Sequence, residues 1–234
     1  MTVTAAAPFD PRIPLLLLLS TTTGLVDAAS VLGLGKVFTA NMTGNVVFLG
    51  FAAAGAPGFK VLPFLAAIAS FLVGAVIAGR MGKANVGRTE RRWLVVSASI
   101  EAVLLWAAAM VAMDFDVATQ APQARLFAII ALTGVAMGYR NGTIRQLKVA
   151  DLTTTVLTMT FTGLGADSSV AGGANTNWRR RIAAVVAIFV GAAIGAWLLF
   201  TFGLVAPLAV AGTVILLATI GCALHPASVR KVAA

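Results

Sequence analysis

Glu101 is the side chain in this sequence whose position most strongly suggests chemistry. It lies near the middle of an apolar stretch, 93–112, between Ile100 and Ala102. A charge at the centre of a membrane helix costs roughly 2.5–3.5 kcal/mol and needs a partner, a watery cavity or a proton. A carboxyl group that binds and releases a proton there could couple a solute to a proton gradient. The alternative is a structural Glu that joins two helices, and in either case we expect Glu101 to face protein or a cavity.

A second acid, Asp27, lies deep in the first apolar stretch, four residues after the end of a polar run at 20–23. Asn141 occupies the corresponding place later in the chain and has a similar shape without the charge. The neighbouring Arg140 could extend its head to the membrane interface. It could also pair with Asp27 or Glu101, and both alternatives stay open.

Two polar clusters interrupt apolar segments. The first contains Asn41, Thr43, Gly44 and Asn45 and is expected to open a half-helix, whose free N–H groups suit an anion or a carbonyl. The second contains Asp151, Thr154 and Thr155, and Asp151, Thr155, Thr158 and Thr162 are expected on one helix face. Such a stripe either lines a pathway or bonds a neighbouring helix. We favour a solute pathway, with both clusters flanking one central cavity.

The composition identifies the environment that must hold these side chains. Of the 234 residues, 59% are hydrophobic and 11% charged, and the mean hydropathy is +0.96. Soluble domains carry roughly 25% charged residues, so the chain predicts an integral membrane protein. Its net charge of +9 comes from basic residues at segment ends, which indicates topology signals rather than nucleic-acid binding. We recognise no metal cluster, cofactor motif or nucleophile set, and therefore expect neither a cofactor nor an enzyme.

The pattern of apolar segments predicts an all-α fold. Eight candidates occur, at 15–34, 37–55, 61–79, 93–112, 125–144, 149–165, 182–202 and 205–224. If all eight span, basic residues divide almost equally between the two sides. If 37–55 and 149–165 instead re-enter, only Lys36, Lys60 and Arg125 remain outside. We therefore predict one transmembrane domain, 1–234, with six spanning helices, two re-entrant or broken segments and cytoplasmic termini.

The sequence also predicts an internal repeat, about 14–112 and about 125–224, although Thr- and Gly-rich membrane helices can also look alike by chance. The matching blocks are 24–28 with 138–142, 40–47 with 150–157, and 71–75 with 189–193. Three matches in the same order favour duplication. Because each copy has three spanning helices, the second must run opposite to the first, which is typical of secondary transporters.

The blocks Gly24 to Ala28 and Val37 to Asn45 resemble the YoaK-like family of bacterial membrane proteins. That family shows G-x-x-D-A followed by F-x-x-N-M-T-G-N, and later G-x-x-N-A/G, read here as Gly138 to Gly142. The second copy departs from the first, since 151–155 lacks its glycine. The resemblance implies a small multispanning inner-membrane protein and supplies neither substrate nor functional residues.

The leading functional hypothesis is a bacterial inner-membrane transporter or exporter of a small polar or anionic solute, coupled to protons. The alternatives are a passive channel and a non-transporting scaffold. The expected partners are the lipid bilayer and an unidentified small solute, and a homodimer remains open because small membrane chains often dimerise.

Overall fold

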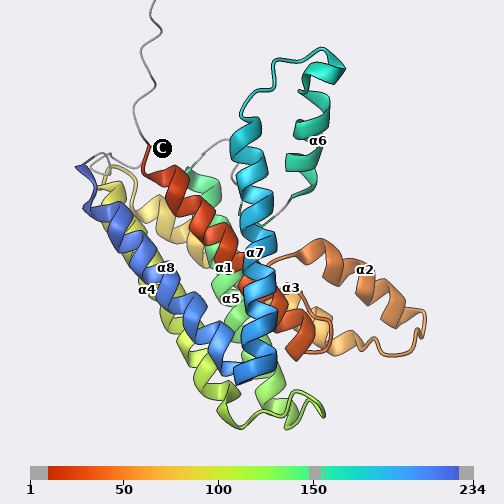
Figure 1. Ribbon diagram of the computed structural model, residues 1–234. Helices are drawn as coiled ribbons and strands as arrows, with labels where there is room; N and C mark the ends of the chain where they lie inside the picture. Colours follow the sequence, from red (N-terminus) through yellow and green to blue (C-terminus); the bar gives the residue numbers. More distant parts are fainter. Residues whose placement is uncertain (1–9, 148–153, 156, 227–234) are drawn as a thin grey trace, which may run out of the picture.

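The computed structural model describes residues 10–147, 154–155 and 157–226, which form helices and connecting loops (Figure 1). Six helices are long: α1 Arg12–Gly33, α3 Val61–Ala84, α4 Glu90–Val111, α5 Gln123–Leu147, α7 Trp178–Phe202 and α8 Val205–Leu224. Two are short: α2 Met42–Ala53 and α6 Thr158–Ala166. Single 3₁₀ turns follow α4 (η1, Ala112–Asp114) and α6 (η2, Ser169–Ala171).

Five of the long helices, α1, α3, α4, α7 and α8, are long and apolar enough to cross a membrane. The shortest of them, α8, has 20 residues and extends about 30 Å at 1.5 Å per residue, the thickness of the hydrocarbon core. The predicted all-α membrane class is therefore confirmed. The remaining long helix, α5, has 25 residues but is more polar.

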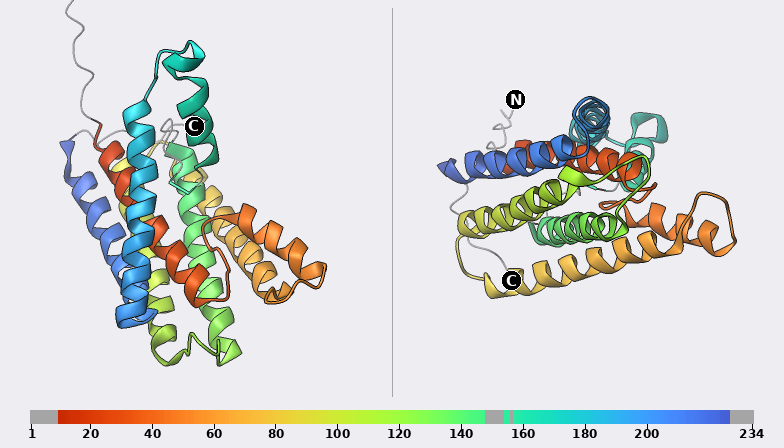
Figure 2. Two further views of the ribbon diagram at one scale, coloured as in Figure 1. Left: turned by 45° about the vertical axis from the view of Figure 1, so that its right-hand side comes forward. Right: turned by 90° about the horizontal axis from the view of Figure 1, so that it is seen from below.

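The polarity of α5 follows from its place inside the bundle. It packs against both α3 and α4 and lies between them (Figure 2). Thr133, Tyr139 and Arg140 on α5 are almost fully buried. Polar side chains on a buried membrane helix can bond to neighbouring helices instead of facing lipid. A hydropathy criterion alone therefore misses a helix that the fold places at its centre.

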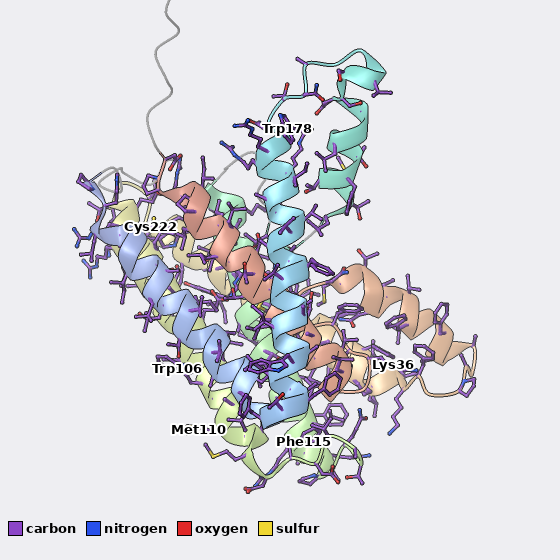
Figure 3. All side chains as sticks on the ribbon, in the orientation of Figure 1. Lys36, Trp106, Met110, Phe115, Trp178 and Cys222 are labelled. Atoms are coloured by element: carbon purple, nitrogen blue, oxygen red, sulfur yellow. The ribbon has the colours of Figure 1, made fainter. Side chains whose placement is uncertain are left out.

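The start of α1 and the end of α8 lie close together. The Cys222 thiol at the end of α8 lies 3.5 Å from the Pro11 carbonyl oxygen, just before α1. Arg12 lies 4.0 Å from Glu90, at the start of α4. Figure 3 shows Cys222 at this end of the bundle and Met110 and Phe115 at the opposite one. The α3–α4 connection, with its cluster of arginines at 88–92, therefore lies at the end where α1 begins and α8 ends.

Two pairs of long helices approach too closely for a side chain to fit between them. Between α1 and α7, a Cβ added to Gly24 would overlap the Ile188 carbonyl oxygen. A Cβ added to Gly191 would likewise overlap the Thr21 carbonyl oxygen. Small residues at such crossings let helix backbones pack directly, which is a common source of helix association in membranes.

The same arrangement recurs between α3 and α5. A Cβ on Gly74 would overlap the Val135 carbonyl oxygen, and one on Gly138 would overlap that of Phe71. In both helix pairs, each glycine faces the carbonyl three residues before the other glycine. The two crossings therefore share one geometry, although they use different helices.

The two short helices are held differently. Phe48 of α2 packs against Phe59 and Phe64, with ring centroids 5.2 and 5.9 Å apart. By contrast, Arg181 of α7 forms an ion pair of 2.7 Å with Asp167, just after α6, and its guanidinium lies against Gly163. An aromatic cluster thus holds α2, and an ion pair holds α6.

One part of the sequence prediction is wrong. The expected face of Asp151, Thr155, Thr158 and Thr162 does not form on a single helix, because α6 begins only at Thr158 and Thr155 precedes it. Asp151 lies outside the described residues. In the first copy α2 begins within the aligned block 40–47, at Met42, whereas α6 begins just after the aligned block 150–157, at Thr158.

Candidate functional site

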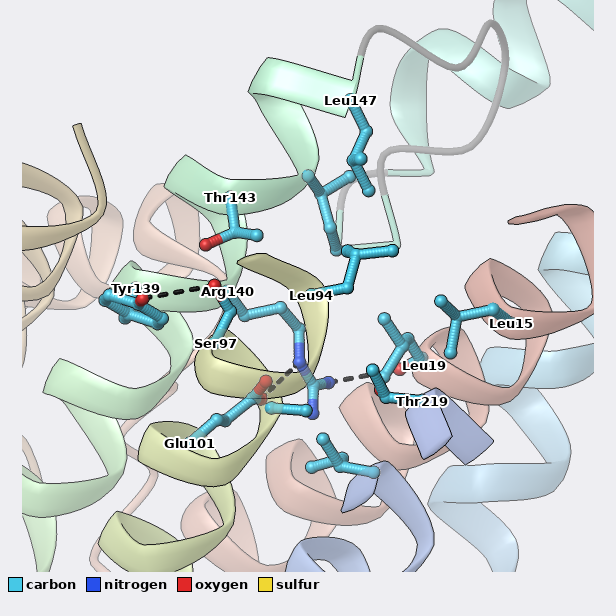
Figure 4. Close-up of a pocket in the computed structure, with 13 residues that line it drawn as sticks. Leu15, Leu19, Leu94, Ser97, Glu101, Tyr139, Arg140, Thr143, Leu147 and Thr219 are labelled. Carbon is cyan, nitrogen blue, oxygen red and sulfur yellow. Dashed lines mark hydrogen bonds and ion pairs between the residues drawn. The ribbon is translucent and has the colours of Figure 1, made fainter. Parts of the chain in front are cut away.

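The centre of the bundle contains a buried ion pair. Glu101 of α4 pairs through Oε1 with Nε of Arg140 on α5 (Figure 4). Only 4% of Glu101 and 2% of Arg140 is exposed. The expectation that Glu101 faces protein is confirmed. Arg140 does not extend to the interface: α5 places it against α4, where it pairs with one of the two acids considered for it.

Arg140 also connects the pair to α1. Its Nη1 donates to the Leu19 carbonyl oxygen at 3.1 Å and to the Thr23 hydroxyl at 2.9 Å. Its Nη2 is buried and has no hydrogen-bond partner among the residues that the structure describes. One guanidinium thus joins α1, α4 and α5, and keeps an N–H group available for another acceptor.

A cavity of about 30 Å³ surrounds this guanidinium. Its walls come from α1, α4, α5 and α8. The apolar lining includes Leu15, Leu94, Leu147 and Ile215, and hydroxyl groups come from Ser97, Tyr139, Thr143 and Thr219 (Figure 4). A water molecule needs roughly 10–15 Å³ of such space, so the cavity has room for about two waters.

Asp27 fixes the chain that follows α1. Its Oδ1 accepts a hydrogen bond of 3.2 Å from the Ala40 backbone N–H. Because Asp27 lies six residues before the end of α1, segment 34–41 must run back along the helix by roughly 9 Å to reach it. Asp27 also lies one turn after Thr23 and within electrostatic range of Arg140. It borders the site without lining the cavity.

The first polar cluster shapes the start of α2, as expected. Asn41 is the residue before its first turn. Asn45 is fully buried, and its amide donates to the Phe38 carbonyl at 2.6 Å and accepts from the Phe38 N–H at 2.9 Å. Gly44 lies against the Phe38 ring, and Thr43 is exposed. Both bonding groups of Asn45 are therefore used within the fold.

The second cluster is described only in part. Thr155 donates to Oδ1 of Asn141 at 2.5 Å, and Thr154 has a positive φ of 61°. Asn141 thus bonds to Thr155, which follows α5 in the chain, as Asp27 bonds to Ala40, which follows α1. The cavity walls include neither Thr154 and Thr155 nor any residue of 41–45. The polar breaks adjoin this cavity through Asp27 and Asn141 and do not form its walls.

Sequence reasoning missed several side chains of the cavity. Ser97 lies one helical turn before Glu101, and Tyr139 precedes Arg140; their hydroxyls are 3.2 Å apart. Thr219 comes from α8, and nothing in the sequence relates it to the pair. The described residues contain no group of three or more potential metal ligands.

These features define a multispanning α-helical membrane protein with a buried, charged centre. The family model described as a protein of unknown function, DUF1275, matches residues 15–221. The chain belongs to this family. A curated relative, the UPF0700 transmembrane protein YoaK of Bacillus subtilis (strain 168), is 34% identical over 166 residues and covers 68% of each chain. No solved structure matches significantly.

Proposed function

We propose that this protein is a proton-coupled secondary transporter of a small polar or anionic solute, in a bacterial inner membrane. The Glu101–Arg140 pair beside a small cavity carries this proposal. Buried ion pairs are poor stabilisers, because burying two charges costs about as much as their attraction returns. Ionisable groups kept inside a membrane bundle commonly mark solute or proton pathways.

The reciprocal glycine contacts support an inverted repeat. Gly24 corresponds to Gly138 in the sequence alignment, and exchanging the two halves turns the α1–α7 crossing into the α5–α3 crossing. Each half has three long helices, so the halves run in opposite directions through the membrane. Transporters of this design alternate access by moving one repeat against the other.

The short helices support two re-entrant segments. At about 1.5 Å per residue, the 12 residues of α2 and the nine of α6 extend roughly 18 and 14 Å, about half the hydrocarbon core. Segment 34–41 returns along α1 to Asp27 before α2 begins. Backbone of this kind persists at membrane depth where protein bonds satisfy it.

The size of the cavity favours a transporter over a channel. Space for about two waters, bordered by leucines from α1, α4 and α5, is too small for a continuous water path. A solute would enter only when helices separate, as alternating access requires. In the scaffold alternative the ion pair only joins helices. The flux experiment below distinguishes a scaffold from a transporter.

Glu101→Gln is expected to abolish proton-driven accumulation while solute exchange continues, because glutamine keeps the shape of the side chain but carries no exchangeable proton. A thermal-shift screen of purified protein identifies the solute, and uptake into proteoliposomes measures both activities. Asp116→Asn, in an exposed loop, is the control and should transport normally. Unchanged coupling in Glu101→Gln would assign Glu101 a structural role, and absence of flux with every solute would favour a scaffold.

Cytoplasmic termini are proposed because most of the described basic residues lie at the end of the bundle where α1 begins and α8 ends. In a Cys222→Ser background, Val170→Cys should react with a membrane-impermeant thiol reagent only from the cytoplasmic side. Ala118→Cys, at the opposite end, should react only from outside. Both positions are exposed. External labelling of Val170→Cys would contradict the re-entrant topology.

A further inference from the structure

Resting on the proposed function, we propose that Glu101 and a short organic monocarboxylate compete for Arg140, so that each anion binds together with one proton. The geometry of the guanidinium carries this inference. Its Nε and Nη2 form one edge, which can hold both oxygens of a carboxylate at once. Glu101 occupies only Nε, and Nη2 is left buried and unpartnered beside the cavity.

An anion that enters as the helices separate completes this edge only if Glu101 leaves it. Nη1 does not take part in the exchange, since it is held by the Leu19 carbonyl and the Thr23 hydroxyl. The displaced Glu101 carboxylate then has no cation, and an unpaired charge inside a membrane bundle is costly. Taking up a proton removes that cost. The free carboxyl of Glu101 is then a neutral neighbour of the bound anion.

Charge balance sets the stoichiometry. Exchanging the Glu101 carboxylate for a bound carboxylate, with one proton added to Glu101, leaves the buried charge unchanged. A dianion would add one uncompensated negative charge. The other charged groups do not alter this balance. Asp27 on α1 is present in both states, and α8 has no charged side chain over Val205–Leu224. The arginines and lysine of α3 and α7 lie at the ends of those helices.

The walls select a carboxylate with a small, mostly apolar body. Leu15, Leu94, Leu147 and Ile215 offer no hydrogen bonds, and Ser97 and Tyr139 already bond to each other. Phosphate and sulfate need many more donors than the one available edge provides. A short aliphatic monocarboxylate satisfies the edge with its head and the walls with its chain.

The test is calorimetric binding of sodium propionate to the purified protein from about pH 6 to about pH 8, where propionate is ionised. The Kd of the wild type should rise about tenfold per pH unit over the range in which Glu101 is ionised in the protein without propionate. The reason is that one proton is bound with each anion. Titrations in buffers with different ionisation enthalpies should give about one proton taken up per propionate. Succinate and phosphate should bind at least about tenfold more weakly.

Glu101→Gln should bind propionate with a Kd independent of pH and without proton uptake. When the anion displaces the introduced glutamine from the Nε–Nη2 edge of Arg140, the displaced amide carries no charge and needs no proton. Arg140→Lys should weaken binding, since an ammonium cannot hold both oxygens. A pH-independent Kd in the wild type, proton uptake in Glu101→Gln, or preferred binding of succinate or phosphate overturns the inference. If the glutamine variant does not fold, the buffer titrations of the wild type decide alone.

The experiment separates this inference from the proposed function. If propionate binds with one proton but no monocarboxylate crosses proteoliposome membranes, the binding inference stands and the transport proposal fails. If a different solute is transported with protons and no monocarboxylate binds, the transport proposal stands and this inference fails.

Discussion

Arg140→Met is expected to lower the free energy of unfolding by about 3–5 kcal/mol, because it leaves the Glu101 carboxylate buried without its cation. It also removes the donor to Leu19 and Thr23. Thermal unfolding of purified protein in detergent measures the change. The loss should be smaller at acidic pH, where Glu101 can bind a proton and become neutral.

The double variant Glu101→Leu/Arg140→Met should be more stable than Arg140→Met alone, because it removes both charges together. Arg125→Met is the matched control. It breaks the 2.7 Å ion pair with Asp114, whose side chain is 75% exposed, and should cost only about 0–1 kcal/mol. If the double variant is as unstable as the sum of its single substitutions, the pair does not act as a unit.

Gly74→Ala is expected to destabilise the protein by about 1–3 kcal/mol, the usual cost of forcing extra atoms into a packed contact. The added methyl group would overlap the Val135 carbonyl oxygen, so α3 and α5 must separate. Gly79→Ala, on the same helix, meets no atom within 4 Å and should leave the unfolding temperature unchanged or raise it. Unfolding of both variants in detergent gives the comparison.

The same experiment tests the repeat. Gly191→Ala on α7, which would overlap the Thr21 carbonyl, should cost about as much as Gly74→Ala on α3, since both occupy the same place in their crossings. If Gly191→Ala is tolerated like Gly79→Ala, the two crossings are not equivalent in energy. The glycine contacts would then no longer support duplication.

Sequence reasoning succeeded where a residue's own position limits its environment. A Glu at the centre of a long apolar helix is costly to expose to lipid, so its burial among other helices could be predicted from that free-energy cost alone. The long helices were recognised because lipid requires about 20 apolar residues in a row. The sequence repeat aligns Gly24 with Gly138, whereas the blocks 71–75 and 189–193 place Gly74 one position away from Gly191.

It failed where neighbouring segments decide the outcome. Asn45 belongs to a polar cluster that the sequence assigns to a solute pathway, but in the fold its amide bonds to the Phe38 backbone. Thr155 fits a helical stripe by spacing, yet it lies in a loop and donates to Asn141. Thr219 lines the cavity only because α8 packs against α1 and α4. None of these contacts leaves a local pattern in the sequence.

The different attachment of the two short helices makes them respond to different surroundings. The contact of Phe48 with Phe59 and Phe64 depends on apolar area, which dissolved ions barely affect at physiological concentration. The Asp167–Arg181 pair is partly open to water, with 46% of the Asp167 side chain exposed, and mobile ions screen such pairs within about 8 Å at cellular ionic strength. Rising salt therefore loosens α6 from α7 while α2 stays docked. The regions around α2 and α6 thus differ in their sensitivity to the ionic composition around them.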